Sequence, residues 1–138
     1  MLDAVHMRPN PDSWPAPTLS TASTDAKIHY RQGIAAMVAG IAHADSLLGG
    51  SIAADGDFYL ARLGLAVALA VMGAHFVAPL PAGPLTRGER QHAEIVLATF
   101  AGDVRHADDL RREHLLEYPG DLLIVWLPAA PIPKTERT

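Results

Sequence analysis

Apolar residues recur at every third or fourth position in the first long run of the sequence, residues 24–40. The apolar side of this run comprises Ile28, Ile34, Ala35, Met37, Val38 and Ile41. Lys27, Arg31 and Gln32 fill the opposite side, and Thr24 or Asp25 is expected to cap the start. This spacing predicts an amphipathic helix with one buried face. A second run with the same period, residues 42–54, follows Gly40, so the two runs predict a helical hairpin.

The third run, residues 58–72, is apolar on nearly all sides, and Arg62 is its only charged residue. A helix with this pattern is expected to be buried against several neighbours. Gly73 ends the run. Pro79, Pro81 and Pro84 then exclude a regular helix from residues 74–84, because proline lacks the backbone N–H that a helix requires.

Three further helices are predicted after the proline-rich stretch. Thr86 and Glu89 have the spacing of a capping box at the start of residues 86–100. Gly102 separates this helix from the next, residues 104–118, and a short apolar element follows at 122–127. We therefore predict an all-α domain over residues 24–127, as helical hairpins in a short α-solenoid or a compact bundle. The proline and polar content of residues 1–23 and 128–138 predicts a flexible N-terminal arm and a flexible C-terminal tail.

Composition narrows the classes of function. The 138 residues carry a formal net charge of −4, which argues against a nucleic-acid partner. The absence of cysteine excludes disulfides and thiolate metal sites, and no secretory signal is visible in residues 1–23, so a cytoplasmic location is expected. The most apolar stretch, residues 63–72, has about half of the ~20 residues that a membrane span needs. We expect no membrane association and no cofactor.

The helical hairpins share an internal pattern of small and helix-breaking residues. Gly102 is followed five residues later by Ala107, and Pro119 comes twelve residues after that alanine. In the first hairpin, Gly40 is followed by Ala44, and Gly56 again comes twelve residues after the alanine. The glycine ends a helix in a left-handed conformation, and the alanine lets the paired helices approach each other. Pro119 or Gly56 then ends the second helix of the hairpin.

This pattern resembles the tetratricopeptide repeat (TPR) family, in particular its divergent bacterial members. The resemblance covers roughly residues 30–127 and rests on the segments DGDFYLARLGLAVALAVMG and LTRGERQHAEIVLATFAGDVRHADDLRREHLLEYPGDLL. It implies an α-solenoid whose faces bind proteins or peptides, and it implies no reaction. The chain departs from the family after Gly73, where the family has a second helix, and it is shorter than the usual arrays.

Candidate metal ligands occur on the predicted helix at residues 104–118. His106, Asp109, Glu113 and His114 include pairs three or four residues apart that share a helix face. However, His106 and His114 lie about 12 Å apart along a helix axis, too far to bind one ion. No HExxH motif is present. The sequence therefore favours a solvated helix face over a metal site.

Candidate acid–base chemistry is confined to residues 89–94. Glu89 and His92 are three residues apart and could act as a pair. The simpler interpretation is that Glu89 completes a capping box beside an Arg90–Glu94 helix pair. No GxSxG motif and no phosphate-binding loop is present, so the sequence favours a protein that is not an enzyme, without excluding a minor activity.

These patterns predict a protein-interaction scaffold that associates with a protein or peptide, most simply with a second copy of itself. The self-association surface is expected within residues 60–72 or 122–127, or both, because their apolar side chains must be buried against another element. The candidate partner-binding residues are Arg62, Glu89, Arg90, His92, Leu123, Ile124 and Trp126. The alternative is a small-molecule-binding protein or minor enzyme with a pocket lined by Phe58, Phe76, His92 and Phe100.

Overall fold

The computed structural model describes residues 14–132, so the predictions for residues 1–13 and 133–138 lie outside the described residues. The described part contains no strand, and the predicted all-α class is confirmed. Its helices are α1 (Thr24–Val38), α2 (Ala44–Ala54), α3 (Tyr59–Val71), α4 (Arg87–Phe100), α5 (Val104–Glu117) and α6 (Leu122–Trp126). A 3-10 helix, η3 (Leu127–Ala129), follows directly. It includes Pro128, which the sequence analysis assigns to the irregular tail; proline is tolerated there because it lies in the first turn.

The helix starts follow from their capping residues. Thr86 and Glu89 form the predicted capping box at the start of α4. The cap of α1 is Ser23 rather than Thr24 or Asp25, because the Ser23 hydroxyl accepts a hydrogen bond from the Ala26 N–H at 3.0 Å.

Three helices end in the same way. Gly40, Gly73 and Gly102 have φ angles of 71°, 105° and 80°, in the left-handed region that favours glycine. The residue after each glycine donates its N–H to the carbonyl five residues earlier: Ile41 to Ala36, Ala74 to Leu69 and Asp103 to Ala98. Each of these ends is therefore a Schellman motif, the conformation expected of the sequence pattern at these glycines.

The buried face of α1 is rotated from the predicted stripe. Ile34 and Met37 are buried as expected, but Ile28 and Ile41 are exposed. Tyr30 and Gly33 are buried instead. The reason is the close pairing of α1 with α2: a Cβ atom on Gly33 would lie 2.7 Å from Cγ of Leu48 on α2.

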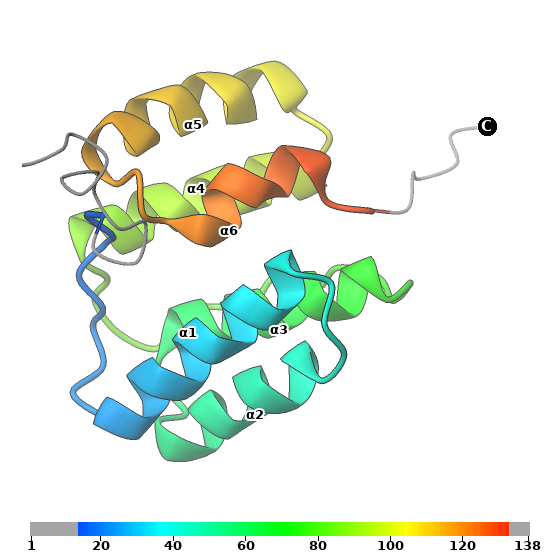
Figure 1. The fold of residues 1–138 in the computed structure, drawn as a ribbon. Helices are drawn as coiled ribbons and strands as arrows, with labels where there is room; N and C mark the ends of the chain where they lie inside the picture. The colour runs from blue at the N-terminus through cyan, green and yellow to red at the C-terminus, as the bar shows by residue number, and fades with distance from the viewer. Residues whose placement is uncertain (1–13, 133–138) are drawn as a thin grey trace, which may run out of the picture.

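The helices form a closed arrangement (Figure 1). The elements α1, α2 and α3 lie together on one side, and α4, α5 and α6 lie together on the other. The last helix, α6, packs against the first, α1. In an open solenoid each repeat contacts only its neighbours in sequence, so of the two predicted architectures the compact helical bundle describes this arrangement.

Residues 72–86 connect the two sides without regular secondary structure, as the prolines predict. This linker runs alongside α3. The Tyr59 hydroxyl donates to the Pro79 carbonyl, and the Arg62 guanidinium donates to the Leu80 carbonyl, both at 3.1 Å. The linker thus lies against α3.

The core is closed by residues that the sequence analysis assigns to a dimer interface. Leu63 and Val67 of α3 are fully buried, as are Leu123 and Ile124 of α6, and all four belong to one core cluster within the chain. The expectation that Leu123 and Ile124 contact a partner is therefore corrected, because their own chain already covers them.

Within the part of the chain that the structure describes, no helix is long and apolar enough to cross a membrane.

Candidate functional site

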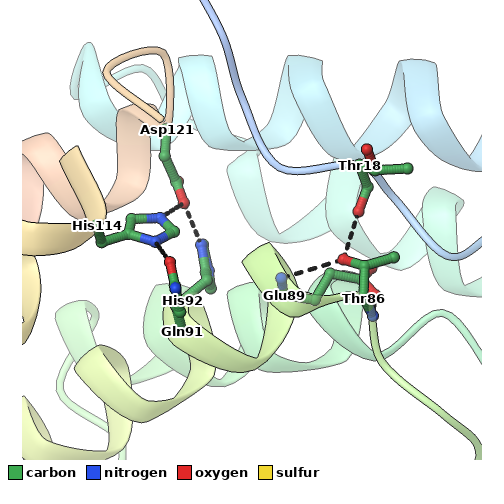
Figure 2. A network of polar contacts seen from close by, with 7 residues as sticks. All are labelled: Thr18, Thr86, Glu89, Gln91, His92, His114 and Asp121. Atoms are coloured by element: carbon green, nitrogen blue, oxygen red, sulfur yellow. Dashed lines mark hydrogen bonds and ion pairs between the residues drawn. The ribbon is translucent and has the colours of Figure 1, made fainter. Parts of the chain in front are cut away.

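Two polar side chains project from α4 into the interior of the bundle. Glu89 and His92 are three residues apart, which places them on the same face of the helix, and both have an exposed fraction of 0%. Burying such groups is costly unless they are hydrogen-bonded. The partner of His92 is Asp121, from another segment of the chain (Figure 2), and Ser20 is a distant partner of Glu89.

Asp121, directly before α6, connects α4 and α5. Its Oδ2 atom accepts hydrogen bonds from Nδ1 of His92 and from Nε2 of His114, both at 2.8 Å (Figure 2). Asp121 and both histidines are buried. Because an ionised carboxylate can only accept hydrogen bonds, each of these two ring nitrogens carries a proton.

The second ring nitrogens of the two histidines have different surroundings. Nδ1 of His114 lies 2.8 Å from the side-chain amide of Gln91 on α4, so the His114 ring joins Gln91 to Asp121. His92 donates only through Nδ1, and its Nε2 has no hydrogen-bond partner among the described residues.

The two histidines affect the acidity of Asp121. Burial acts to raise the pKa of this carboxyl, but the opposing effects of His92 and His114 together lower it below its ordinary value. The carboxylate is therefore ionised throughout the physiological range. It holds the imidazole rings of both histidines in fixed orientations.

The lowered pKa predicts a dependence of stability on pH. Because the pKa of Asp121 in the folded chain lies below its ordinary value of 3.8, the unfolded chain binds this proton more tightly. The resulting stabilisation is complete above about pH 5 and is lost as the pH falls. We expect the stability advantage of the wild type over Asp121→Asn to shrink between about pH 5 and pH 3 in urea denaturation. A constant difference across this range would contradict the assigned ionisation.

An extended segment, residues 14–21, covers the network; we call it the N-terminal strap. The Gly120 N–H donates to the Pro15 carbonyl at 2.7 Å, and the Thr86 hydroxyl donates to the Thr18 carbonyl at 2.7 Å. The N–H and hydroxyl of Ser20 both donate to Oε2 of Glu89, at 2.9 and 3.0 Å. These residues lack regular secondary structure, as the sequence predicts for residues 1–23, but they are hydrogen-bonded to the helical domain.

A pocket of about 380 Å³ lies between the strap, α1 and the start of α6. His92 and Asp121 contribute to its wall together with Tyr30 and Arg31 of α1. Burial raises the pKa of the Tyr30 hydroxyl well above its ordinary value, and the negative charges of Asp121 and Glu89 raise it further. The positive charge of Arg31, in the same wall, acts on this pKa in the opposite direction.

The predicted partner-binding residues do not form one surface. Glu89, His92, Leu123 and Ile124 are buried within the chain. Arg62 and Trp126 are half-buried, and Trp126 packs against the core. Arg90 is exposed and donates to the Leu85 carbonyl at 2.9 Å; in the described residues it forms no ion pair with Glu94.

The predicted phenylalanine pocket is also not formed as expected. Phe58 is 1% exposed and packs edge-on against Tyr30 in the core. Phe76 stacks on Phe100, with ring centroids 4.1 Å apart, at a separate pocket of about 1020 Å³. His92 lines the smaller pocket instead.

No pattern in the sequence indicates the roles of Asp121 and Gln91, and the prediction that His114 lies on a solvated face is wrong. His114 is 1% exposed, whereas His106 on the same helix is exposed. The spacing of Ala107, Leu110 and His114, three and then four residues, is the signal that places His114 on the inward face. Among the described residues no group of three or more His, Asp or Glu side chains is placed to hold a metal ion.

Comparisons of the sequence with family models and curated proteins, and of the structure with solved structures, find no match. Functional inference for this chain therefore depends on its own geometry. Two features are available for that purpose: the repeated helix ends with their paired helices, and the buried histidine network beside the smaller pocket.

Proposed function

We propose that this chain is a TPR-like helical scaffold that works by binding another protein, and that it first associates with a second copy of itself. The observation that carries this proposal is that three helices end in the same glycine motif at similar spacing along the chain. The glycines of the three Schellman motifs, Gly40, Gly73 and Gly102, are 33 and 29 residues apart. This spacing is close to the 34-residue period of tetratricopeptide repeats.

The helix pairing supports the same proposal. The helices contact each other most extensively within two hairpins, α1–α2 and α4–α5. In each pair a buried alanine, Ala44 or Ala107, lies at the start of the second helix, soon after the Schellman glycine. A small side chain at this position lets the two backbones approach, which is the physical reason for its repetition.

The surface best suited to a protein partner is formed by α3 and the linker. Its exposed apolar residues, here called the linker strip, are Leu69, Met72, Val77 and Leu80, exposed by 39%, 68%, 73% and 80%. Large exposed apolar side chains are candidates for contact with another protein. Because the linker takes the place of a hairpin helix, α3 lacks the neighbour that would bury Leu69 and Met72. A second copy of the chain is the simplest partner that would bury these residues, since two-fold homodimers are the commonest oligomers.

Charged substitutions in the linker strip are expected to abolish self-association. Met72→Glu combined with Leu80→Glu places two carboxylates in the proposed contact and should weaken it by at least about 100-fold. Both side chains are exposed, so the fold is expected to survive. Sedimentation velocity at micromolar concentration measures the change in mass.

Leu116→Glu is the matched control, because Leu116 is 87% exposed on α5 and lies outside the linker strip. This variant should associate like the wild type. A wild-type chain that sediments as a monomer, or a strip variant that still associates, would overturn the proposed self-association.

A further inference from the structure

The N-terminal strap lies on a part of the helical domain that two glycines open for it. A Cβ atom on Gly120 would overlap the carbonyl oxygen of Trp14. A Cβ atom on Gly88, in the first turn of α4, would lie 2.7 Å from Cβ of Pro17 and 3.1 Å from Cζ of Tyr118. Any side chain at either glycine would therefore collide with the strap, whose backbone approaches closely at these two points.

The same region offers hydrogen-bonding groups at positions that suit an extended chain. The Gly120 N–H and the Thr86 hydroxyl each donate to a strap carbonyl. Oε2 of Glu89 accepts from both the N–H and the hydroxyl of Ser20 (Figure 2 shows Glu89 beside Thr86). Because the Glu89 side chain is 0% exposed, its carboxylate needs donors to offset the loss of water. We call this region, formed by Thr86, Gly88, Glu89, Tyr118 and Gly120, the strap seat.

Two strap residues make the contacts that depend on side-chain identity. Pro17 is the buried residue within 14–20, and its ring lies against Gly88. Proline favours an extended backbone, which lowers the entropy lost on docking. Ser20, three residues later, supplies the hydroxyl to Glu89. The strap seat is therefore suited to an extended segment that has proline followed by serine at this spacing.

The strap is held less firmly than the helices. Trp14, Pro15, Ala16 and Thr18 are exposed, and the described strap continues into the domain only through residues 22–23. Segments with few buried side chains open at a lower free-energy cost than the core. The strap of another copy would make the same contacts with the seat, so an exchange between copies loses none of them.

We propose that the strap seat is an exchangeable docking site, which the strap of a second copy occupies when the chain's own strap opens. Each copy offers one strap and one seat, so mutual exchange closes a two-fold dimer. The inference rests on the proposed self-association for the identity of the partner. It uses a different surface, however, because the linker strip takes no part in the strap seat.

Two complementary variants test the exchange in full-length chains. The strap variant, Pro17→Asp with Ser20→Ala, keeps an open seat but loses a fitting strap. The seat variant, Gly120→Ala, keeps the strap but closes the seat; Gly120 does not have a positive φ, so alanine fits its backbone. Both also carry Met72→Glu and Leu80→Glu, which remove the linker strip. We expect each variant alone to sediment as a monomer at high micromolar concentration and their equimolar mixture to form a heterodimer.

A labelled peptide of residues 14–21 measures the same contact by fluorescence anisotropy. It should bind the strap variant at least about tenfold more tightly than the wild type, whose own strap competes for the seat. Adding Gly120→Ala to the strap variant should weaken peptide binding by at least about tenfold. Gly49→Ala is the matched control, because a Cβ atom at Gly49 meets no other group, and it should leave binding unchanged.

The proposal is overturned if the two folded variants do not associate on mixing, or if Gly120→Ala leaves peptide binding intact. Peptide binding without association of the chains would exclude a second copy as the occupant and assign the seat to a segment of another protein. Hydrogen exchange of the wild type decides the matter even where a variant fails to fold. The Gly120 amide should exchange faster than the amides in the middle of α4, and exchange only through global unfolding would show that the strap does not open.

Discussion

Asp121→Ala is expected to lower the free energy of unfolding by about 2–6 kcal/mol, a large fraction of the stability of a domain this size. The substitution leaves Nδ1 of His92 and Nε2 of His114 without the acceptor that both share. Each buried polar group left without a partner costs about 1–3 kcal/mol, because it was removed from water without compensation. Urea denaturation monitored by circular dichroism measures the loss.

The control for this experiment is another aspartate that forms an ion pair at the surface. The Asp109 carboxylate lies 3.6 Å from the Arg112 guanidinium one turn away, and both side chains are mostly exposed. Asp109→Ala should cost no more than about 0.5 kcal/mol, because surface pairs are screened by water. If the two variants lose equal stability, the His92–Asp121–His114 network does not hold α4, α5 and α6 together.

The helices of this chain could be predicted because each of them depends on local signals. Glycine at the three Schellman ends and proline in the linker stop helices through backbone geometry that only neighbouring residues influence. The capping box of Thr86 and Glu89 is equally local, and it forms as predicted. Such signals require no knowledge of tertiary packing.

The closure of the bundle could not be predicted in the same way. The return of α6 onto α1 brings together segments about ninety residues apart, and no local pattern encodes that contact. Without it, Leu123 and Ile124 looked like residues in need of a partner chain. With it, they complete the core of their own chain.

The buried network was missed for a related reason. Asp121 is 29 residues from His92, and in sequence it resembles an ordinary turn residue after Pro119 and Gly120. Glu89 was correctly assigned to a cap, but its second role, as the acceptor for Ser20 of the strap, joins residues 69 positions apart. The polar residue types were visible in the sequence, whereas their convergence depends on the tertiary fold.

The role of α6 in closing the core predicts losses of stability of very different size at two adjacent residues. Ile124 is fully buried, whereas Val125 is 49% exposed. Ile124→Ala should therefore lower the free energy of unfolding by about 2–5 kcal/mol, because it removes buried methyl groups and leaves a cavity. Val125→Ala should cost less than about 1 kcal/mol, since water already contacts its side chain.

Chemical denaturation at several protein concentrations separates a core within one chain from a core shared between two copies. If α6 completes its own chain, the loss in Ile124→Ala is the same at every concentration, because association through another surface stabilises the wild type and the variant equally. A loss that changes with concentration would place Ile124 between copies and contradict the packing of α6 against α1. Equal losses in the two variants would show that Ile124 is not the core residue of this helix.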